Sequence, residues 1–166
     1  MFMKILDSKQ IQQKINRIAI QILESNFAEK EIILAGINNN GMGFAKLLQK
    51  KLQSRSEIEI TLCQIRLNPA KPIADEILLD MEEKQLNKKV IIIVDDVANT
   101  GRTIFYAFKP FLAILPKKVE LAVLIDRKHK SFPVKPDYVG LALATTEKEN
   151  IEVSIKPIKS AEVQLV

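Results

Sequence analysis

Two adjacent carboxylates follow the most apolar run of the chain. Val90–Val94 is a run of five branched apolar residues, which is typical of a strand buried on both faces of a parallel sheet. Asp95 and Asp96 stand where this strand should end. Ligands of open α/β sheets bind at the carboxyl ends of the strands, beside the N-terminus of the following helix. The two carboxylates are therefore candidates for a binding or catalytic site.

The residues that follow could bind a phosphate group. Ala98–Thr103 has small side chains, the hydroxyls of Thr100 and Thr103, and Gly101, which allows a ligand to approach the backbone closely. Main-chain N–H groups at the start of a helix would hold such an anion. Because the carboxylates would repel a phosphate, we expect them to face sugar hydroxyls or a Mg²⁺ ion shared with substrate phosphates. The alternative, that the acids only end a strand, is disfavoured by the Thr-Gly-Arg-Thr that follows them.

A second stretch is rich in glycine. Three of the five glycines, Gly36, Gly41 and Gly43, lie at or just after a predicted strand, Glu31–Ile37. Glycine permits backbone conformations and close approaches that other residues cannot adopt. The stretch favours a second site lined by backbone, or a polar turn before a helix over residues 44–52. Taken alone, it does not separate these two interpretations.

Two further helices are predicted around these sites. Asp7, with Gln10 three residues later, has the pattern of a capped helix that runs to Ser25 with isoleucines along one face. Apolar residues at helical spacing predict a second helix over Thr103–Leu115. Pro110 must kink or shorten that helix, because proline lacks the N–H group that an inner turn requires.

The other strands are read from alternation and from apolar runs. A half-buried strand is predicted from Glu57 to Leu67, and two prolines then interrupt it, so that residues 66–76 should form a hairpin or a flexible flap. Further strands are predicted at Ile73–Asp80, Val119–Ile125, Asp137–Leu143 and Ile151–Ile155.

The run from Asp95 to Thr103 resembles the phosphoribosyl-pyrophosphate (PRPP) signature of the type I phosphoribosyltransferases. Further segments resemble the pyrimidine-operon attenuator proteins that double as uracil phosphoribosyltransferases: Leu6-Asp7, Gly36-Ile37, Leu124–Arg127 with His129 and Pro133, and Asp137–Gly140. The resemblance implies an α/β fold with a central, mostly parallel sheet flanked by helices. It also implies a single domain over residues 1–166, with a core at about 1–143, a flap at about 64–80 and a small hood at about 144–166.

The resemblance implies a role for each candidate residue. The implied catalytic residues are Asp95 and Asp96. The implied ligands of the PRPP 5-phosphate are Ala98, Asn99, Thr100, Gly101, Arg102 and Thr103. The implied pyrophosphate-binding residues are Ile37, Asn38, Asn39, Asn40 and Gly41. Arg66 and Lys71 belong to the flap, and Asp126, Arg127 and His129 to the base pocket. The implied cofactor is Mg²⁺, which PRPP carries and for which Asp95 and Asp96 are the candidate protein contacts.

The chain departs from the attenuator proteins in two places. Those proteins have basic residues where Asn38 and Asn40 stand, so we expect a weaker hold on pyrophosphate unless Lys46, Arg66 or Lys71 compensates. They also carry a Tyr-Arg-Asp-Asp run in place of the present Cys-Gln-Ile-Arg at residues 63–66, which leaves the chemistry of the flap open.

The expected activity is transfer of ribose 5-phosphate from PRPP to a nucleobase. Members that act on 6-oxopurines have an aspartate where Asn99 stands, and an amide has no proton to exchange near neutral pH, so uracil is the preferred base. An alternative is a nucleotide-sensing, RNA-binding regulator of pyrimidine genes that has lost catalysis. A third is a nucleotide-binding protein with neither activity.

Composition excludes several classes of protein. The chain has 166 residues, 47% of them hydrophobic and 27% charged, which is ordinary for a globular protein. Cys63 is the only cysteine, so an internal disulfide is impossible. No signal-peptide pattern or membrane-length apolar run is present, so we expect a cytoplasmic protein. The net charge of +5 leans only mildly toward anionic partners, and the resemblance implies a homodimer.

Overall fold

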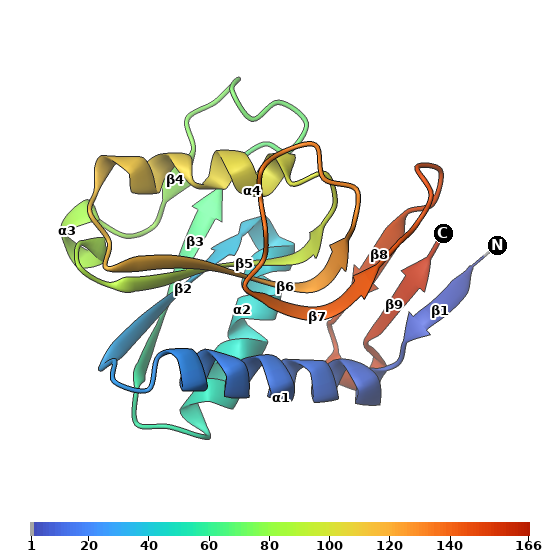
Figure 1. The fold of residues 1–166 in the computed structure, drawn as a ribbon, viewed down its shortest axis with the longest axis horizontal. Helices are drawn as coiled ribbons and strands as arrows, with labels where there is room; N and C mark the ends of the chain where they lie inside the picture. The colour runs from blue at the N-terminus through green and yellow to red at the C-terminus, as the bar shows by residue number, and fades with distance from the viewer. Residues whose placement is uncertain (1) are drawn as a thin grey trace.

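Two β-sheets organise the chain in this computed structural model, which describes residues 2–166. The larger sheet has six strands in the order β4-β3-β2-β5-β6-β7, and the smaller has three in the order β1-β9-β8 (Figure 1). The strands of the larger sheet are β2 (Glu31–Ile37), β3 (Glu59–Arg66), β4 (Leu78–Leu79), β5 (Val90–Ala98), β6 (Lys118–Arg127) and β7 (Tyr138–Leu143). Those of the smaller sheet are β1 (Met3–Leu6), β8 (Ile151–Ser154) and β9 (Glu162–Leu165).

The larger sheet is parallel except for β4, which pairs antiparallel with β3. The apolar run Val90–Val94 forms the first part of β5, which lies between β2 and β6 and is completely buried there. Branched apolar residues fit this central position because both faces of the strand are covered. The predicted central strand is therefore confirmed, and its carboxyl end carries the two acids.

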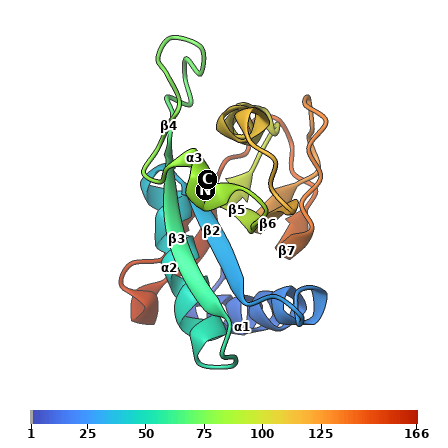
Figure 2. The ribbon, with the colours of Figure 1, turned by 90° about the vertical axis from the view of Figure 1, so that its left-hand side faces the viewer.

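Helices cover both faces of the larger sheet (Figures 1 and 2). On one face α1 (Ser8–Ser25) and α2 (Asn38–Gln53) pack with the sheet in one apolar cluster. On the other face lie α3 (Glu83–Leu86), α4 (Arg102–Ala107) and the 3₁₀ helix η1 (Lys109–Ala113). No helix among residues 2–166 is both long and apolar enough to cross a membrane.

Helix α1 begins where the sequence predicts. The Asp7 side chain accepts a hydrogen bond from the Gln10 N–H, and the Gln10 side chain accepts one from the Asp7 N–H. This reciprocal pair satisfies two N–H groups that the first helical turn would leave without partners. The buried face of the helix consists of Ile11, Ile15, Ile18, Ala19 and Ile22.

The smaller sheet is built from both ends of the chain. β9 lies in its centre, antiparallel to both β1 and β8, at one end of the molecule (Figure 1). A short 3₁₀ helix, η2 (Ile158–Ser160), connects β8 to β9. Ile155 and Val163 join the apolar cluster under α1 and α2, so this sheet is packed onto the body of the protein.

Two predicted boundaries were wrong, and the predicted shortening of a third element was confirmed. Helix α2 begins at Asn38, six residues before the predicted start at Phe44, so the glycine-rich stretch is mostly helical. The strand predicted over Ile73–Asp80 is only Leu78–Leu79, because the hairpin occupies the residues before it. The helix from Thr103 is cut at Ala107, and Pro110 lies in the first turn of η1, where its missing N–H costs nothing.

Candidate functional site

A cleft opens at the carboxyl ends of β2 and β5. The chain leaves β2 through α2 toward β3 and leaves β5 through α4 toward β6, so the two connections diverge to opposite sides. Such a switch point leaves a crevice in which α/β proteins bind ligands. The cleft has a volume of about 450 Å³ and is lined by Ile37, Asn38, Asn39, Asn40, Pro69, Asp95, Asp96, Val97, Asn99, Thr103 and Ile151.

A smaller cavity adjoins this cleft on the side of the second sheet. Its volume is about 250 Å³, and it shares Asn39, Asn40 and Asp96 with the cleft. The rest of its lining is Gly43 from α2 and the segment 153–156 from the end of β8. We call it the side cavity. The two spaces meet at these shared residues, so a single ligand can extend from one into the other past Asp96.

Asp95 and Asp96 lie on the floor of the cleft without a counter-ion. Neither forms an ion pair within residues 2–166. One Asp95 carboxylate oxygen accepts a hydrogen bond from the Asp96 N–H, and one Asp96 oxygen accepts from the Val97 N–H. Burial and the neighbouring Asp96 carboxylate raise the pKa of Asp95 well above its usual value. Burial also raises the pKa of Asp96. Two carboxyl groups with raised pKa values in a cleft mark a candidate functional site. Such a pair can hydrogen-bond to sugar hydroxyls or contact a cation.

The β5–α4 loop, Asn99–Gly101, is supported by hydrogen bonds that residues 130–132 donate to its carbonyl groups. The Lys130 ammonium donates to the carbonyls of Ala98 and Asn99, at 3.4 and 3.0 Å. The N–H groups of Ser131 and Phe132 both donate to the Thr100 carbonyl, at 2.9 and 3.1 Å. All three carbonyls therefore point toward the segment 130–132.

This arrangement aims the N–H groups of the loop the other way. In a trans peptide the C=O of one residue and the N–H of the next point in opposite directions. The N–H groups of residues 99–101 accordingly face away from the segment 130–132, and none has an acceptor within residues 2–166. Gly101 has φ of 86°, a left-handed conformation that favours glycine, and it leads directly into α4. Three free N–H groups beside a helix start are suited to an anion.

The three residues predicted for a base pocket do not line the cleft. Asp126 pairs with Lys130 at 2.6 Å, and His129 contacts the Thr145 carbonyl. Arg127 is buried and donates four hydrogen bonds, to the side chains of Thr145 and Asn99 and to the carbonyls of Thr146 and Glu149. These contacts connect the end of β6 to the loop before β8 and to the rim of the cleft.

The junction between β2 and α2 has no loop at all. A side chain at Gly41 would place its Cβ 2.5 Å from the Val94 carbonyl, and one at Gly36 would lie 2.6 Å from the Met42 Cα. Glycine is therefore required where α2 begins against β5. The start of α2 has no side-chain cap, so N–H groups of its first turn remain open beside Asn39 and Asn40.

The Asn38 side chain serves a contact that the sequence does not indicate. Its amide accepts from the Leu67 N–H at 3.0 Å and donates to the Leu67 carbonyl at 2.9 Å. Asn38 itself has φ of 51°, which asparagine tolerates better than most residues. This pair of bonds ties the start of α2 to the end of β3, at the base of the flap.

The flap, residues 67–77, projects from the body of the molecule (Figures 1 and 2). It contributes Pro69 to the cleft, and the Arg102 guanidinium donates to the Pro69 carbonyl at 2.7 Å. Neither Arg66 nor Lys71 lines the cleft, and Arg66 donates to the Gln64 side chain. The three basic residues predicted at phosphate sites, Arg66, Lys71 and Arg102, are thus not turned into the cleft.

Two lysines near the site were not predicted from the sequence. Lys130 supports the β5–α4 loop, and Lys156 lines the side cavity. Neither carries a sequence signal, because a lysine in a charged surface segment looks like any solubilising residue. Only tertiary contacts identify them.

The residues present fit a Mg²⁺ ion that a substrate carries. No cluster of three or more His, Cys, Asp or Glu side chains that could hold a metal occurs within residues 2–166. Asp95 and Asp96 offer one pair of carboxylates, and Mg²⁺ is commonly held by one or two carboxylates together with substrate phosphates and water. A resident metal held by protein alone does not fit this donor set.

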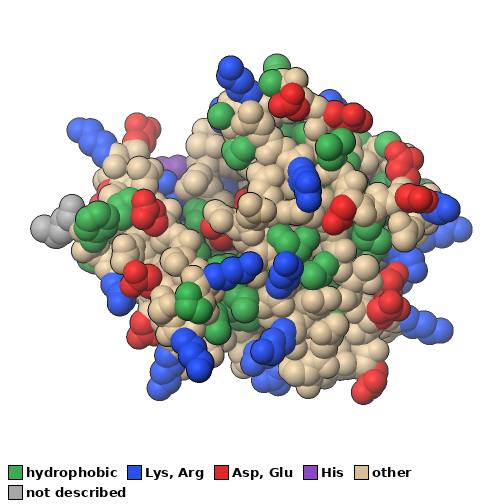
Figure 3. Space-filling view, turned by 180° about the vertical axis from the view of Figure 1, so that it is seen from behind, with side chains coloured by type: hydrophobic (Ala, Val, Ile, Leu, Met, Phe, Trp, Pro, Cys, Tyr) green, Lys and Arg blue, Asp and Glu red, His purple; other side chains and the backbone are tan. Residues whose placement is uncertain are grey.

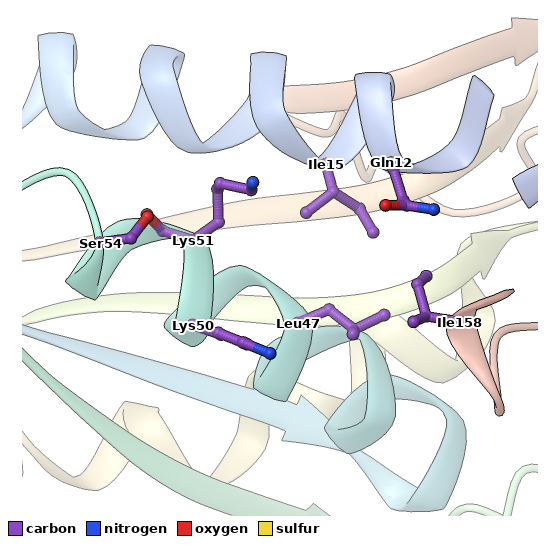
Figure 4. A pocket seen from close by; sticks show the side chains of 7 residues that line it. All are labelled: Gln12, Ile15, Leu47, Lys50, Lys51, Ser54 and Ile158. Carbon is purple, nitrogen blue, oxygen red and sulfur yellow. The ribbon is translucent and has the colours of Figure 1, made fainter. Parts of the chain in front are cut away.

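Another groove lies between α1 and α2, away from the carboxylates (Figure 4). Ile15, Leu47 and Ile158 give it an apolar floor, and Lys50 and Lys51 stand at its edge. On the face seen from behind, lysine and arginine side chains lie among hydrophobic ones in the lower part of the view (Figure 3). Its lining contains no carboxylate, imidazole or thiol.

Comparisons with known proteins agree with the geometry. The proteins called "Bifunctional protein PyrR" from Alkaliphilus metalliredigens and Fusobacterium nucleatum are 38% and 36% identical to this chain, over 93% and 95% of it and 88% and 93% of their own lengths. Crystal structures of a Bacillus anthracis hypoxanthine-guanine phosphoribosyltransferase and a Trypanosoma cruzi hypoxanthine phosphoribosyltransferase align with TM-scores of 0.73 and 0.75. Their identities are 21% and 16%, over 85% and 86% of this chain and 82% and 78% of theirs, which supports the fold alone.

The sequence also matches the phosphoribosyl transferase domain family over residues 3–157. The expected α/β fold, with a mostly parallel sheet between helices, is confirmed by the architecture and by the structural neighbours. The chain therefore belongs to the phosphoribosyltransferase domain family and has the type I phosphoribosyltransferase fold.

Proposed function

We propose that the protein transfers ribose 5-phosphate from PRPP to uracil and releases pyrophosphate. The observation that supports this proposal is the β5–α4 loop, whose N–H groups point away from its support and have no acceptor, beside two carboxylates that form no ion pair within residues 2–166. A phosphate on the loop would place the attached ribose over Asp95 and Asp96. Few substrates other than a phosphorylated sugar need a site of both kinds so close together.

The roles follow from the chemistry of the transfer. The transition state has a sugar cation and a departing anion, so catalysis depends on position and on electrostatic stabilisation. The loop N–H groups bind the 5-phosphate. The carboxylates of Asp95 and Asp96 hydrogen-bond to the ribose hydroxyls and stabilise the cationic ring. Mg²⁺, when bound, neutralises charge on the pyrophosphate. The open N–H groups at the start of α2 receive the departing group.

Asn99 supports a pyrimidine rather than a 6-oxopurine. Its side-chain oxygen accepts a hydrogen bond from Arg127 at 3.0 Å, so the amide NH₂ group is the part left for the cleft. An NH₂ group can donate to a carbonyl oxygen of the base, and it cannot take up a proton near neutral pH. Uracil presents such carbonyl oxygens.

Replacing Asp96→Asn tests the activity. We expect UMP formation from PRPP, Mg²⁺ and uracil to fall by about 100-fold or more, because the amide no longer stabilises the cationic sugar. The control is Asp75→Asn, an exposed flap residue that does not line the cleft. Product formation would be followed by chromatography. No UMP from the wild-type protein, and no turnover with a panel of other bases, would contradict the proposal.

The relatives named bifunctional support a second candidate, an RNA-binding regulator that senses nucleotides. Such a protein should bind its RNA tightly, with an affinity that falls steeply with salt because phosphate contacts release counterions. Filter binding at several salt concentrations would measure this. Weak binding that is indifferent to RNA sequence would remove the candidate. The assembly we expect is a homodimer, which light scattering would test.

A further inference from the structure

The cleft and the side cavity have an unusual balance of charge for a site that holds phosphates. Their charged lining side chains within the described chain are Asp95, Asp96 and Lys156. Among residues 2–166, Lys156 is therefore the one cationic side chain that lines either space. A substrate with a 5-phosphate and a diphosphate would meet two carboxylates and this single ammonium group.

The backbone at Lys156 is anchored by its buried neighbour, while the Lys156 side chain itself is exposed. Lys156 lies two residues after the end of β8, and the residue between them, Ile155, is buried in the apolar cluster under α1 and α2. A Cβ built on Gly43 would lie 3.5 Å from the Lys156 Cε and 3.9 Å from its Nζ. The ammonium group thus lies over the first turns of α2, next to Asn39 and Asn40. The backbone after β8 of the smaller sheet therefore positions the Lys156 ammonium group beside the start of α2.

Lys156 has no anionic partner within residues 2–166. Six lysines form ion pairs with carboxylates within residues 2–166, and Lys156 is not among them. A cation near the N-terminal end of a helix is disfavoured by the helix dipole. An anion placed between the ammonium group and the open N–H groups of α2 would turn this repulsion into attraction on both sides.

The other basic residues near the site are committed elsewhere or lie outside it. The Arg102 guanidinium donates to the Pro69 carbonyl, and Arg66 donates to Gln64. Lys46 and Lys71 are exposed, as Lys156 is, but neither of them lines the cleft or the side cavity. Any direct cationic contact to a ligand that spans the two spaces must therefore come from Lys156.

We propose that Lys156 binds the diphosphate group of the donor substrate from the side cavity. The inference rests on the proposed function, since that function places the 5-phosphate on the β5–α4 loop and the sugar over the carboxylates. The diphosphate then extends past Asp96 toward Asn39 and Asn40, into the space that Lys156 lines. Lys156 supplies there the positive charge that Asn38 and Asn40 lack.

The test compares Lys156→Gln with three references. Lys156→Arg keeps the charge, and Lys159→Gln removes a charge from an exposed residue of η2 that lines neither space. The third reference is a ligand, UMP, which carries the 5-phosphate and no diphosphate. Affinities for PRPP, inorganic pyrophosphate and UMP would be measured by calorimetry with Mg²⁺, and KM for PRPP by steady-state kinetics.

Lys156→Gln should weaken PRPP and pyrophosphate binding about tenfold, because one charge-assisted hydrogen bond is lost. UMP affinity should stay unchanged, Lys156→Arg should retain most of the PRPP affinity, and Lys159→Gln should match the wild type. Equal PRPP affinity in Lys156→Gln and wild type would overturn the inference and leave the proposed function standing. An equal loss for UMP would also overturn it. A wild-type protein that binds neither PRPP nor pyrophosphate would overturn both.

Discussion

The two turns on either side of the cleft present main-chain N–H groups in different ways. The β5–α4 loop is held from behind by Lys130, Ser131 and Phe132, which bind its carbonyls. The junction between β2 and α2 is held by close packing of backbone on backbone, which Gly36 and Gly41 permit. The conformation of the β5–α4 loop depends on hydrogen bonds that neighbouring groups donate to it. The conformation of the β2–α2 junction depends on the absence of side chains at its glycines.

This difference predicts how each turn tolerates change. The support behind the β5–α4 loop consists of several separate contacts, so the loss of one should loosen the loop gradually. The β2–α2 junction has no room for adjustment, because the atoms in contact belong to the backbone of two central elements. Substitutions there should affect the whole fold.

Gly41→Ala should give the largest effect. Its new Cβ would lie 2.5 Å from the Val94 carbonyl, so α2 or β5 must shift, at a cost of about 3 kcal/mol in the free energy of unfolding. The matched change on the other turn is Gly101→Ala, where φ of 86° costs about 1 kcal/mol. Urea denaturation measures both. If Gly101→Ala proved the more damaging, the contrast between the two turns would be reversed.

Arg127→Met should have an intermediate effect. It removes four hydrogen bonds from a buried side chain and should lower the free energy of unfolding by about 2 kcal/mol. It also frees the Asn99 amide, so binding of UMP should weaken. Thr145→Val removes only one of the four bonds and is the control, with an expected loss of about 1 kcal/mol. Identical losses for the two variants would show that the other three Arg127 contacts, the one to Asn99 included, contribute nothing.

Asp95→Asn should have the smallest effect on stability, and in the opposite direction. Burial and the neighbouring Asp96 carboxylate raise the pKa of Asp95 above the ordinary value of 3.8. A carboxyl group whose pKa is raised by folding destabilises the folded state once the pH rises through its folded pKa. The melting temperature of the variant, relative to wild type, should therefore increase as the pH rises above the ordinary carboxyl range. A difference that shrank with rising pH would contradict the direction of this shift.

Much of the fold could be predicted because its signals are local. The five-residue apolar run predicts β5, and the pairing of Asp7 with Gln10 predicts the start of α1. The candidate cleft could be predicted to the same extent, because carboxyl ends of parallel strands meet at one edge of the sheet. Asp95, Asp96, Asn99 and Thr103 do lie together there.

What could not be predicted depends on contacts between distant segments. Three glycines near a strand end look like a loop, because the sequence does not show that Gly41 lies against the Val94 carbonyl. The role of Asn38 depends on Leu67, which is 29 residues away. Lys130 and Lys156 act on segments 31 and more than 100 positions earlier in the chain, so their charges look like ordinary surface charges in the sequence.

The order of strands in the smaller sheet has a consequence for biosynthesis. β9, which contains residues 162–165, lies between β1 and β8, so β8 has no partner in that sheet until β9 is in place. β8 and the residues after it carry Ile151 and Lys156, which form one wall of the site. A nascent chain can thus form its large sheet and bring its carboxylates together on the ribosome, yet it cannot complete that wall until residues 162–165 have emerged from the exit tunnel.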